Sequence, residues 1–340
     1  MTEPRQWTWH SLGEPEGKGF ADTIRRYDRL PTRAQSRVPE IVWNLSRNSS
    51  SLFSRFRTDA TSIAARWRID GEVLALSHMP ATAVSGLDLY GEADDGKIHW
   101  VGVGHPTTIG VNNAVIAEEI DGMNRNYTVY FPLFNNLEDV QVGVPLGASF
   151  EIVPPDPLTP VVYYGTSIIH GASASRPGMA LPAQLGRRLG RNVIGLGFSG
   201  NGKMEVEIAE HLSEIQAAIY IIDCLPNMDH DLVRERTVPF VQALRAVQPE
   251  TPILLVEDRT FTNAWAIPAK QELHRRKRLE YRTAFDSLVK SGDPNLHYLE
   301  NTGLLGDDDE ATVDSSHPTD LGFSRMAGVL EPVIRKLIEA

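Results

Sequence analysis

The chain has 340 residues, of which 41% are hydrophobic and 23% are charged, which is the composition of an ordinary soluble globular protein. Its 44 acidic and 33 basic residues give a net charge of −11, which opposes binding to a phosphate backbone, so we do not expect nucleic acid as a partner. A single cysteine, Cys224, excludes an internal disulfide and a thiolate metal cluster.

The length of the apolar runs and the amino-terminal residues indicate where in the cell the protein is expected. No apolar run approaches about 18 residues, and the amino-terminal sequence has neither the basic region nor the apolar region of a signal peptide. We therefore expect no membrane association and a cytoplasmic protein, or one that is exported after a signal peptide has been removed.

The amino-terminal part, residues 1–150, is predicted to be an antiparallel β-sandwich or jelly roll. About 30 polar residues with several glycines come first, and we expect them to form an irregular lead-in. Short segments of alternating apolar and polar residues follow, most clearly over residues 63–69, where Trp67 lies on the apolar face and Asp70-Gly71 supplies a turn. Several such segments without a convincing helix favour a sandwich.

Three tryptophans of this part, Trp43, Trp67 and Trp100, have two interpretations. Aromatic rings stack on sugars, which would make the domain a carbohydrate-binding module. They also fill the cores of sandwiches, and the position of Trp67 on the apolar face of its strand favours the core for that residue.

Residues 151–160 contain four prolines and are predicted to be a linker between two domains. Residues 161–340 then alternate between apolar strands and helices, which indicates a parallel sheet covered on both faces. The expected strands are 161–164, 192–196, 217–223, 253–256 and 296–299, and the expected helices are about 180–189, 204–214, 233–247, 269–289 and 321–338.

Ligands of such sheets bind at the carboxyl ends of the strands, where four loops of this chain carry polar residues. Ser167 follows the first strand after a glycine. Gly200 lies in a glycine-rich turn after the second strand, and Asn227 follows the third. Asp314 and His317 follow the last strand. These loops are expected to meet at one edge of the sheet.

The chemistry of these residues is complementary. A serine hydroxyl becomes a good nucleophile when a base takes its proton, and His317 is the candidate base because imidazole titrates near neutral pH. Asp314 could accept a hydrogen bond from the other ring nitrogen. The backbone N–H groups of Ser167 and Gly200 and the side-chain amide of Asn227 could stabilise an oxyanion. The pattern predicts an acyl-transfer site.

Four sequence blocks resemble those of the SGNH hydrolase superfamily, also called GDSL esterases and lipases. In order along the chain they are Gly165-Thr166-Ser167, Gly200, Asn227 and Asp314-x-x-His317. The resemblance extends over residues 161–340. It implies a flavodoxin-like three-layer α/β/α domain with a serine nucleophile, a histidine base, an aspartate partner and the oxyanion donors named above. A preceding β-sandwich resembles one subgroup, whose substrates are often acylated carbohydrates or small acyl esters.

Two blocks depart from the superfamily pattern. The first has Thr166 where the older pattern has aspartate, which leaves the serine in place. The third reads Pro226-Asn227-Met228-Asp229 in place of Gly-x-Asn-Asp, so Asn227 is assigned from its place after the strand.

Some residues have an alternative interpretation or a less specific role. Asp314 and His317 could instead cap the final helix. His170 is expected to be a pocket wall or a structural residue, and Cys224 a buried small hydrophobe. Asn263 and Trp265 follow the fourth strand and are, with His170, possible substrate contacts.

Two other folds are excluded by spacing. An α/β-hydrolase needs a glycine two residues after the serine, where this chain has Ile169. A nucleotide-binding protein would use the loop 197–202, which lacks the full G-x-G-x-x-G spacing and follows the second strand.

The sequence therefore predicts a serine esterase that needs no metal or organic cofactor and acts on a small-molecule or carbohydrate ester. Two alternatives stay open. One is an acyltransferase that passes the same acyl group to an alcohol, and the other is a non-catalytic glycan-binding protein on a hydrolase scaffold. One sequence does not determine the oligomeric state.

Overall fold

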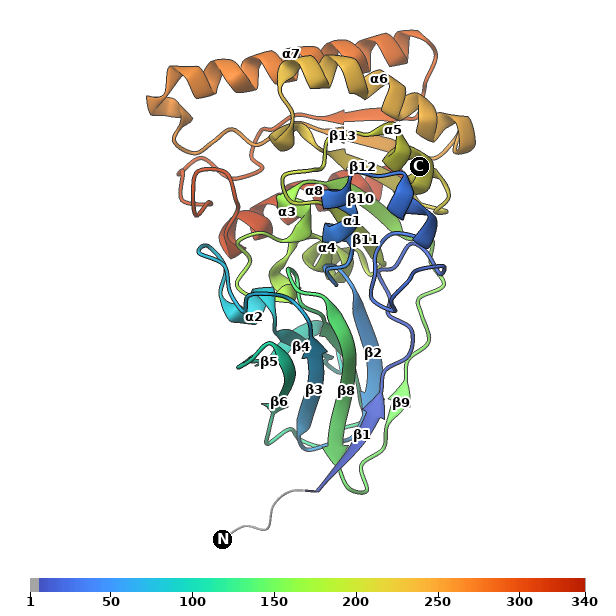
Figure 1. Cartoon of the computed structure of the whole chain (residues 1–340), viewed down its shortest axis with the longest axis vertical. Helices are drawn as coiled ribbons and strands as arrows, with labels where there is room; N and C mark the ends of the chain where they lie inside the picture. Colours follow the sequence, from blue (N-terminus) through green and yellow to red (C-terminus); the bar gives the residue numbers. More distant parts are fainter. Residues whose placement is uncertain (1–5, 340) are drawn as a thin grey trace.

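The computed structural model describes residues 6–339, which form a long molecule with a β-sandwich at one end and a helix-covered parallel sheet at the other (Figure 1). The predicted fold class is confirmed. Among the described residues, no helix combines the length and the apolar content needed to cross a bilayer.

The sandwich consists of two antiparallel sheets. One has the order β1-β8-β3-β6, with β1 (Trp7–Ser11), β8 (Leu137–Pro145), β3 (Ile63–Ile69) and β6 (Gly110–Ala117). The other has the order β5-β4-β7-β2-β9, with β5 (Ile98–Gly104), β4 (Leu87–Glu92), β7 (Arg125–Tyr130), β2 (Phe53–Thr58) and β9 (Glu151–Ile152). A short helix, α2 (Ala81–Val84), precedes β4.

Trp67 confirms the expectation for its strand, because it is completely buried between the two sheets among residues such as Phe56 and Val142. Its indole N–H donates to the Ser85 carbonyl at 2.9 Å. The alternation of β3 therefore places its apolar side chains in the sandwich core.

The parallel sheet has the order β11-β10-β12-β13-β14, which is the flavodoxin-like arrangement. Its strands are β10 (Val161–Gly165), β11 (Val193–Gly197), β12 (Ile219–Asp223), β13 (Ile253–Val256) and β14 (Leu296–Leu299). The helices are α3 (Ser167–His170), α4 (Leu181–Leu189), α5 (Val206–Ser213), α6 (His230–Val247), α7 (Pro268–Lys290) and α8 (Asp320–Ile338). Short 3-10 turns lie at Pro177–Met179, Leu225–Asn227 and Ala264–Ala266.

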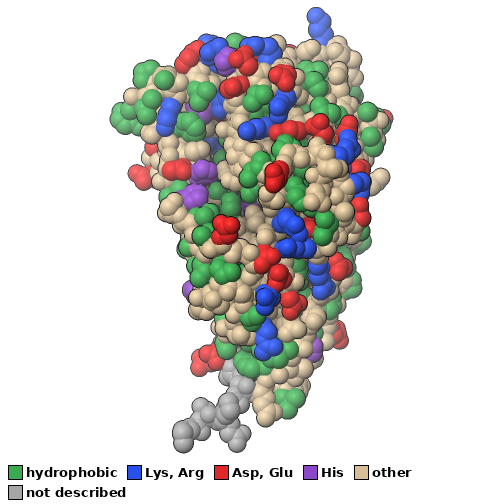
Figure 2. All heavy atoms as spheres, viewed as in Figure 1, with side chains coloured by type: hydrophobic (Ala, Val, Ile, Leu, Met, Phe, Trp, Pro, Cys, Tyr) green, Lys and Arg blue, Asp and Glu red, His purple; other side chains and the backbone are tan. Residues whose placement is uncertain are grey.

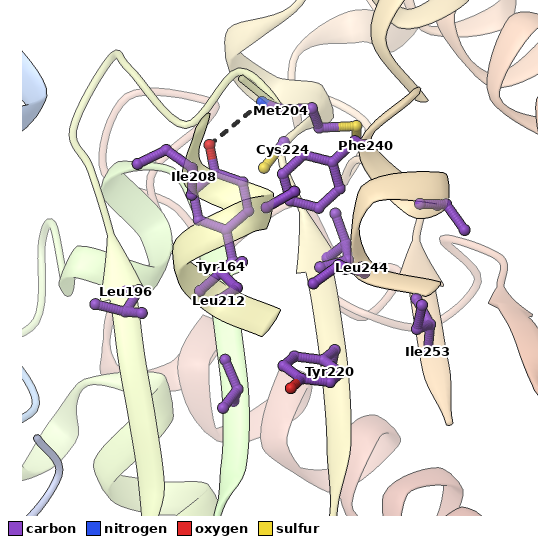
Figure 3. Close-up of a cluster of buried hydrophobic side chains, with 14 of the residues drawn as sticks. Tyr164, Leu196, Met204, Ile208, Leu212, Tyr220, Cys224, Phe240, Leu244 and Ile253 are labelled. Atoms are coloured by element: carbon purple, nitrogen blue, oxygen red, sulfur yellow. Dashed lines mark hydrogen bonds between the residues drawn. The ribbon is translucent and has the colours of Figure 1, made fainter. Parts of the chain in front are cut away.

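Each face of the parallel sheet has its own buried cluster. On the α5 and α6 face, Tyr164 stacks on Phe240 at a centroid distance of 5.4 Å, and its hydroxyl accepts from the Met204 N–H at 3.3 Å (Figure 3). We call this the α5/α6 core. The other cluster, which includes Ile169 and Phe323, lies under α3, α4 and α8, and we call it the α8 core.

The amino-terminal lead-in is more regular than expected. Residues 7–11 form β1 on the edge of β8. The residues that follow the lead-in, 32–46, contain a 3-10 turn (Thr32–Ser36) and helix α1 (Glu40–Ser46), which the sequence pattern did not predict. Leu30 and Trp43 are buried in the α5/α6 core. Trp43 is therefore neither a sandwich core residue nor an exposed stacking platform, because the lead-in crosses over and packs on the parallel-sheet half.

Arg29 fastens this crossing segment to the end of β11. Its guanidinium is buried and donates to four backbone carbonyls, those of Leu45 at 2.7 Å, Asn48 at 2.8 Å (through Nε), Gly197 at 3.0 Å and Gly195 at 3.3 Å. The division at residues 151–160 stays a prediction, but the core of the parallel-sheet half includes side chains from residues 20–43.

Candidate active site

Ser167 lies directly after β10, in the position that the strand-end rule predicts. All five residues of β10 are buried, and Ser167 itself is 5% exposed. Thr166 caps α3 by accepting a hydrogen bond from the Ile168 N–H at 3.4 Å. The cap starts a helical turn at Ser167, so the serine is held at the edge of the sheet.

His317 reaches Ser167 across the sheet edge. The distance from Ser167 Oγ to His317 Nε2 is 2.8 Å, and the distance from His317 Nδ1 to Asp314 Oδ2 is 2.7 Å. The structure therefore brings the predicted serine, histidine and aspartate together in one hydrogen-bonded chain. With Nδ1–H donating to Asp314, Nε2 is free to accept the serine proton.

Asp314 also accepts hydrogen bonds from the backbone of its own loop. Its Oδ1 accepts the backbone N–H groups of Ser316 at 3.0 Å and His317 at 2.8 Å. Partial burial raises the pKa of Asp314, but the hydrogen bonds from His317 and Ser316 lower it further, so the pKa lies below its ordinary value. The carboxylate is thus charged at neutral pH. The alternative interpretation of Asp314 and His317 as caps of the final helix does not hold, because α8 begins at Asp320 with Thr319 at the N-cap position.

Gly200 and Asn227 lie on loops at the same edge. Gly200 has a φ of 70°, and a Cβ built there would meet nothing within 4 Å, so the loop turns sharply and leaves open space beside it. Asn227 Oδ1 accepts the Gly202 N–H at 3.2 Å, which orients its amide. The loop also touches β10, because the Phe198 N–H donates to the Gly165 carbonyl at 3.0 Å.

Gly202 shows how closely this loop approaches β10. A Cβ on Gly202 would lie 2.2 Å from the Gly165 carbonyl oxygen, which only glycine avoids. The close approach brings the turn that carries Gly200 next to the strand that presents Ser167. The role of the Gly200 backbone N–H as an oxyanion donor, like that of the Asn227 amide, stays a prediction.

His170 is not placed to contact a substrate. Its ring has no exposed surface and stacks on Phe134 with centroids 4.1 Å apart. Burial, together with the positive charge of Arg29, holds the pKa of His170 well below its ordinary value, so the ring is neutral. The prediction that His170 contacts a substrate is therefore wrong. His170 is a buried structural residue, because α3 turns its last residue into the interior.

Asn263 is linked through Lys270 to the loop that carries His317, and Trp265 lies two residues further along the chain. Asn263 Oδ1 accepts from Lys270 Nζ at 2.8 Å, and the same ammonium donates to Ser315 Oγ at 3.2 Å. Trp265 is 76% exposed and lines a cavity of about 340 Å³ beside this loop. Substrate contacts by these two residues stay a prediction.

His78 is a neighbour of the triad that sequence reasoning missed. Its ring meets the His317 ring edge to face, with centroids 5.4 Å apart and an interplanar angle of 74°. It comes from the loop between β3 and α2, which approaches the segment before α8 in Figure 1. In the space-filling view, histidine side chains gather in this region (Figure 2). No local pattern in the sequence signals a contact across such a separation.

Asp88 of β4 makes a further contact between the two halves. Its buried carboxylate accepts from the Trp100 indole N–H at 2.9 Å, from Arg176 Nη1 at 2.8 Å and from the Gly178 backbone N–H at 2.8 Å. Burial raises the pKa of Asp88, an effect that the positive charge and hydrogen bonds of Arg176 only partly offset. Trp100 is half exposed, and Arg176 lies over its ring.

Two family models match the chain. The GDSL-like lipase/acylhydrolase family matches residues 159–335, and the model named GxDLY, described as the N-terminus of esterases of the SGNH hydrolase type, matches residues 7–150. The chain reads Gly-Leu-Asp-Leu-Tyr at residues 86–90, so the aspartate of that name is the buried Asp88. No curated protein matches the chain.

Solved structures resemble the chain over nearly its full length. A protein of Bacteroides ovatus described as a GDSL-like lipase is 34% identical, with 98% of each chain covered and a TM-score of 0.93. The salicylyl-acyltransferase SsfX3 from a tetracycline biosynthetic pathway is 19% identical, covering 99% of this chain and 96% of its own, with a TM-score of 0.75.

A family two carbohydrate esterase from Clostridium thermocellum, solved with cellohexaose, is 11% identical, with 98% and 99% of the two chains covered and a TM-score of 0.57. At these identities the second and third structures show a shared fold. With two family models covering most of the chain and a 34% identical structure over its whole length, the chain belongs to the GDSL-like lipase/acylhydrolase family and is a hydrolase of the SGNH type.

Proposed function

We propose that the protein is a serine esterase that forms an acyl-enzyme on Ser167. The observation that carries the proposal is the chain of hydrogen bonds from Ser167 Oγ through His317 to Asp314, at 2.8 and 2.7 Å. Hydroxyl, imidazole and carboxylate in this order are the groups that nucleophilic acyl transfer requires. A glycan-binding protein without catalysis would not need a serine, a histidine and an aspartate in this hydrogen-bonded arrangement.

The proposed reaction has two balanced steps. Ser167 Oγ attacks the ester carbonyl carbon while His317 Nε2 takes the hydroxyl proton, and the carbon–oxygen bond to the alcohol then breaks as His317 returns that proton to the leaving oxygen. In the second step His317 takes a proton from water, the hydroxide oxygen bonds to the acyl carbon, and Ser167 leaves with the proton from His317. Asp314 stabilises the imidazolium in both steps.

The developing oxyanion is assigned to the Gly200 and Asn227 side of Ser167. Backbone N–H groups of Ser167 and Gly200 and the Asn227 amide are the proposed donors. The hydrogen bond from Gly202 to Asn227 Oδ1 supports this assignment, because it occupies the oxygen of the amide and leaves its N–H groups as donors.

The proposed substrate is a short acyl ester of a carbohydrate or of another small alcohol. In support, the carbohydrate esterase solved with cellohexaose has the same two-part fold over the full chain. Transfer to an alcohol acceptor is the second candidate, favoured by the similarity over the full chain to an acyltransferase. Both reactions share the acyl-enzyme and differ in the acceptor that attacks it.

A chromogenic ester assay tests the proposal. The wild type is expected to hydrolyse 4-nitrophenyl acetate, and Ser167→Ala is expected to lower kcat by about 10³-fold or more. Ser287→Ala, at an exposed position of α7, is the matched control and should have wild-type activity. A wild type that cleaves no short-chain ester, or a Ser167→Ala variant as active as the wild type, would show the proposal to be wrong.

Acetylated oligosaccharides offered with and without a free alcohol then separate the two reactions. Release of acetate alone indicates hydrolysis, whereas appearance of the acetylated acceptor indicates transfer.

A further inference from the structure

Hydrogen bonds within the sandwich half fix the backbone of the loop that carries His78. At its start, the Asn135 amide donates to the Val73 carbonyl at 3.1 Å and the Ser85 hydroxyl donates to the Leu74 carbonyl at 2.9 Å. Close to His78 the chain bridges back on itself between Leu76 and Met79, with N–O distances of 3.0 and 3.1 Å. Hydrogen bonds on both sides leave the backbone of this loop little freedom.

Met79 completes the anchoring, because its side chain is 2% exposed and belongs to the α8 core together with Ile168 and Ala311. Ile168 follows the nucleophile directly, and Ala311 lies three residues before Asp314. The residue next to His78 thus belongs to the same buried cluster as residues that lie close to Ser167 and Asp314 in the sequence. Such packing fixes the position of His78 relative to Ser167 and His317.

The imidazole of His78 has a hydrogen-bonding capacity that the described residues do not use. Its Nδ1 is buried without a partner among residues 6–339, and the ring as a whole is half-buried, so Nε2 is the nitrogen that can reach a ligand. Partial burial and the neighbouring His317 lower the pKa of His78, while Asp314 opposes this effect. The neutral ring can donate from one nitrogen and accept at the other.

The loops around Ser167 fall into two groups, one whose residues pack in the α5/α6 core and one whose residues pack in the α8 core. The proposed oxyanion donors belong to loops whose apolar residues, such as Phe198 and Leu225, are in the α5/α6 core. Met79, next to His78, and Ala311, on the segment that carries His317, belong to the α8 core. Because His317 must deliver its proton to the leaving oxygen, the alcohol part of an ester lies on the His317 side. His78 therefore borders the alcohol part.

We propose that His78 of the sandwich half binds the alcohol part of the substrate, through a hydrogen bond between Nε2 and a hydroxyl next to the ester oxygen. The proposal rests on the esterase function above and narrows its substrates to esters of hydroxylated alcohols, such as polyols and sugars. An alcohol acceptor attacks from the position that the leaving alcohol vacates, so the same contact would select acceptors in a transfer reaction.

A pair of esters that differ by one hydroxyl tests this contact. Ethyl acetate and 2-hydroxyethyl acetate carry the same acyl group, and the ratio of their kcat/KM values measures the preference for a neighbouring hydroxyl. The wild type is expected to prefer 2-hydroxyethyl acetate. His78→Phe keeps a ring against His317 without a hydrogen-bonding atom and should lower the ratio about tenfold, the effect of one lost hydrogen bond.

His78→Gln places an amide nitrogen near the Nε2 position and should keep the ratio within about threefold of the wild type, since one hydrogen bond is retained. His105→Ala, at an exposed histidine directly after β5, is the control and should leave the ratio unchanged. Thermal unfolding of each variant verifies that it folds, and His78→Ala replaces His78→Phe if the larger ring does not fit. Acetylated methyl xylosides extend the comparison to sugars.

The outcomes separate this inference from the proposed function. A wild type without esterase activity overturns both. An active wild type whose preference for the hydroxylated ester is unchanged in His78→Phe overturns the role of His78 alone. Equal losses on both esters would also overturn it, because they would show that His78 acts through His317 and not on the alcohol. Loss of the preference in His78→Phe with retention in His78→Gln supports the proposal.

Discussion

Asp314 holds His317 at two points: its Oδ2 accepts from the ring Nδ1 at 2.7 Å and its Oδ1 accepts from the backbone N–H of the same residue at 2.8 Å. Both the position of the backbone and the rotation of the imidazole thus depend on one carboxylate. The arrangement is local, because the two residues are separated by two serines.

Asp314→Asn is expected to lower kcat by about 10³- to 10⁴-fold, because an amide that donates to Nδ1 leaves the wrong ring nitrogen protonated. Its side chain is 44% exposed, so the free energy of unfolding should change little. Ester hydrolysis and thermal unfolding measured on the same preparation provide the test. A variant that keeps more than a tenth of the wild-type rate would contradict the proposed role of Asp314.

Asn227→Ala tests the oxyanion side. Removing one oxyanion donor is expected to lower kcat by about 10²- to 10³-fold with a smaller effect on KM. Asn227→Asp is the informative companion, because it can still accept the Gly202 N–H but has no donor for an oxyanion, and it should be as inactive as the alanine variant. An aspartate variant that recovers the rate would show that Asn227 serves only to hold Gly202.

Asp88 is expected to stabilise the contact between the two halves. Asp88→Ala leaves the Arg176 guanidinium, the Gly178 N–H and the Trp100 N–H without their acceptor and should cost about 3 kcal/mol in the free energy of unfolding. Urea unfolding measures this quantity. Exposed Asp95→Ala in the same half is the control. If the two variants are equally stable, Asp88 does not fasten the halves together.

Asp258 is expected to make the stability of the parallel-sheet half depend on pH. Burial raises the pKa of this carboxyl, but the hydrogen bond from His274 and the positive charges of Lys277 and Arg278 lower it further, to well below its ordinary value. A lowered pKa stabilises the fold above the unfolded-state pKa, about 3.9, and this stabilisation is lost as the pH falls towards the folded-state value.

Asp258→Asn should therefore destabilise the protein by about 3 kcal/mol at pH 7, because it leaves buried cations without their partner. The difference from the wild type should shrink below about pH 4, where the wild type also begins to bind a proton. Urea unfolding at pH 7 and at pH 3.5 tests both parts. A difference that is constant with pH would contradict the lowered pKa.

Ser167, Gly200, Asn227, Asp314 and His317 could be located from the sequence because each follows a recognisable strand of one parallel sheet. A run of apolar residues predicts a buried strand, and the carboxyl ends of parallel strands lie on one edge. These are local patterns joined by one topological rule. The same reasoning did not identify β1, whose five residues are ordered by their pairing with β8, far along the chain.

The positions of His170 and His78 relative to the site could not be predicted from local sequence patterns. His170 follows the nucleophile by three residues, yet α3 turns it into the interior against Phe134. His78 lies in the other half of the chain, yet its loop is anchored beside the triad. The histidine close to Ser167 in the sequence is therefore buried in the interior, whereas the one far away in the sequence contacts His317.

The order and the types of the predicted triad residues, the alternation of β3 and the alternation of strands and helices that indicates a parallel sheet could be determined from the sequence alone, because each depends on the residue pattern within a segment or on the order of segments along the chain. The tertiary structure alone decided that Trp43 packs in the α5/α6 core, that Asp88 holds Arg176 and that His78 meets His317. These contacts depend on which surfaces of distant segments fit together, and side-chain packing settles that only when the whole chain is folded.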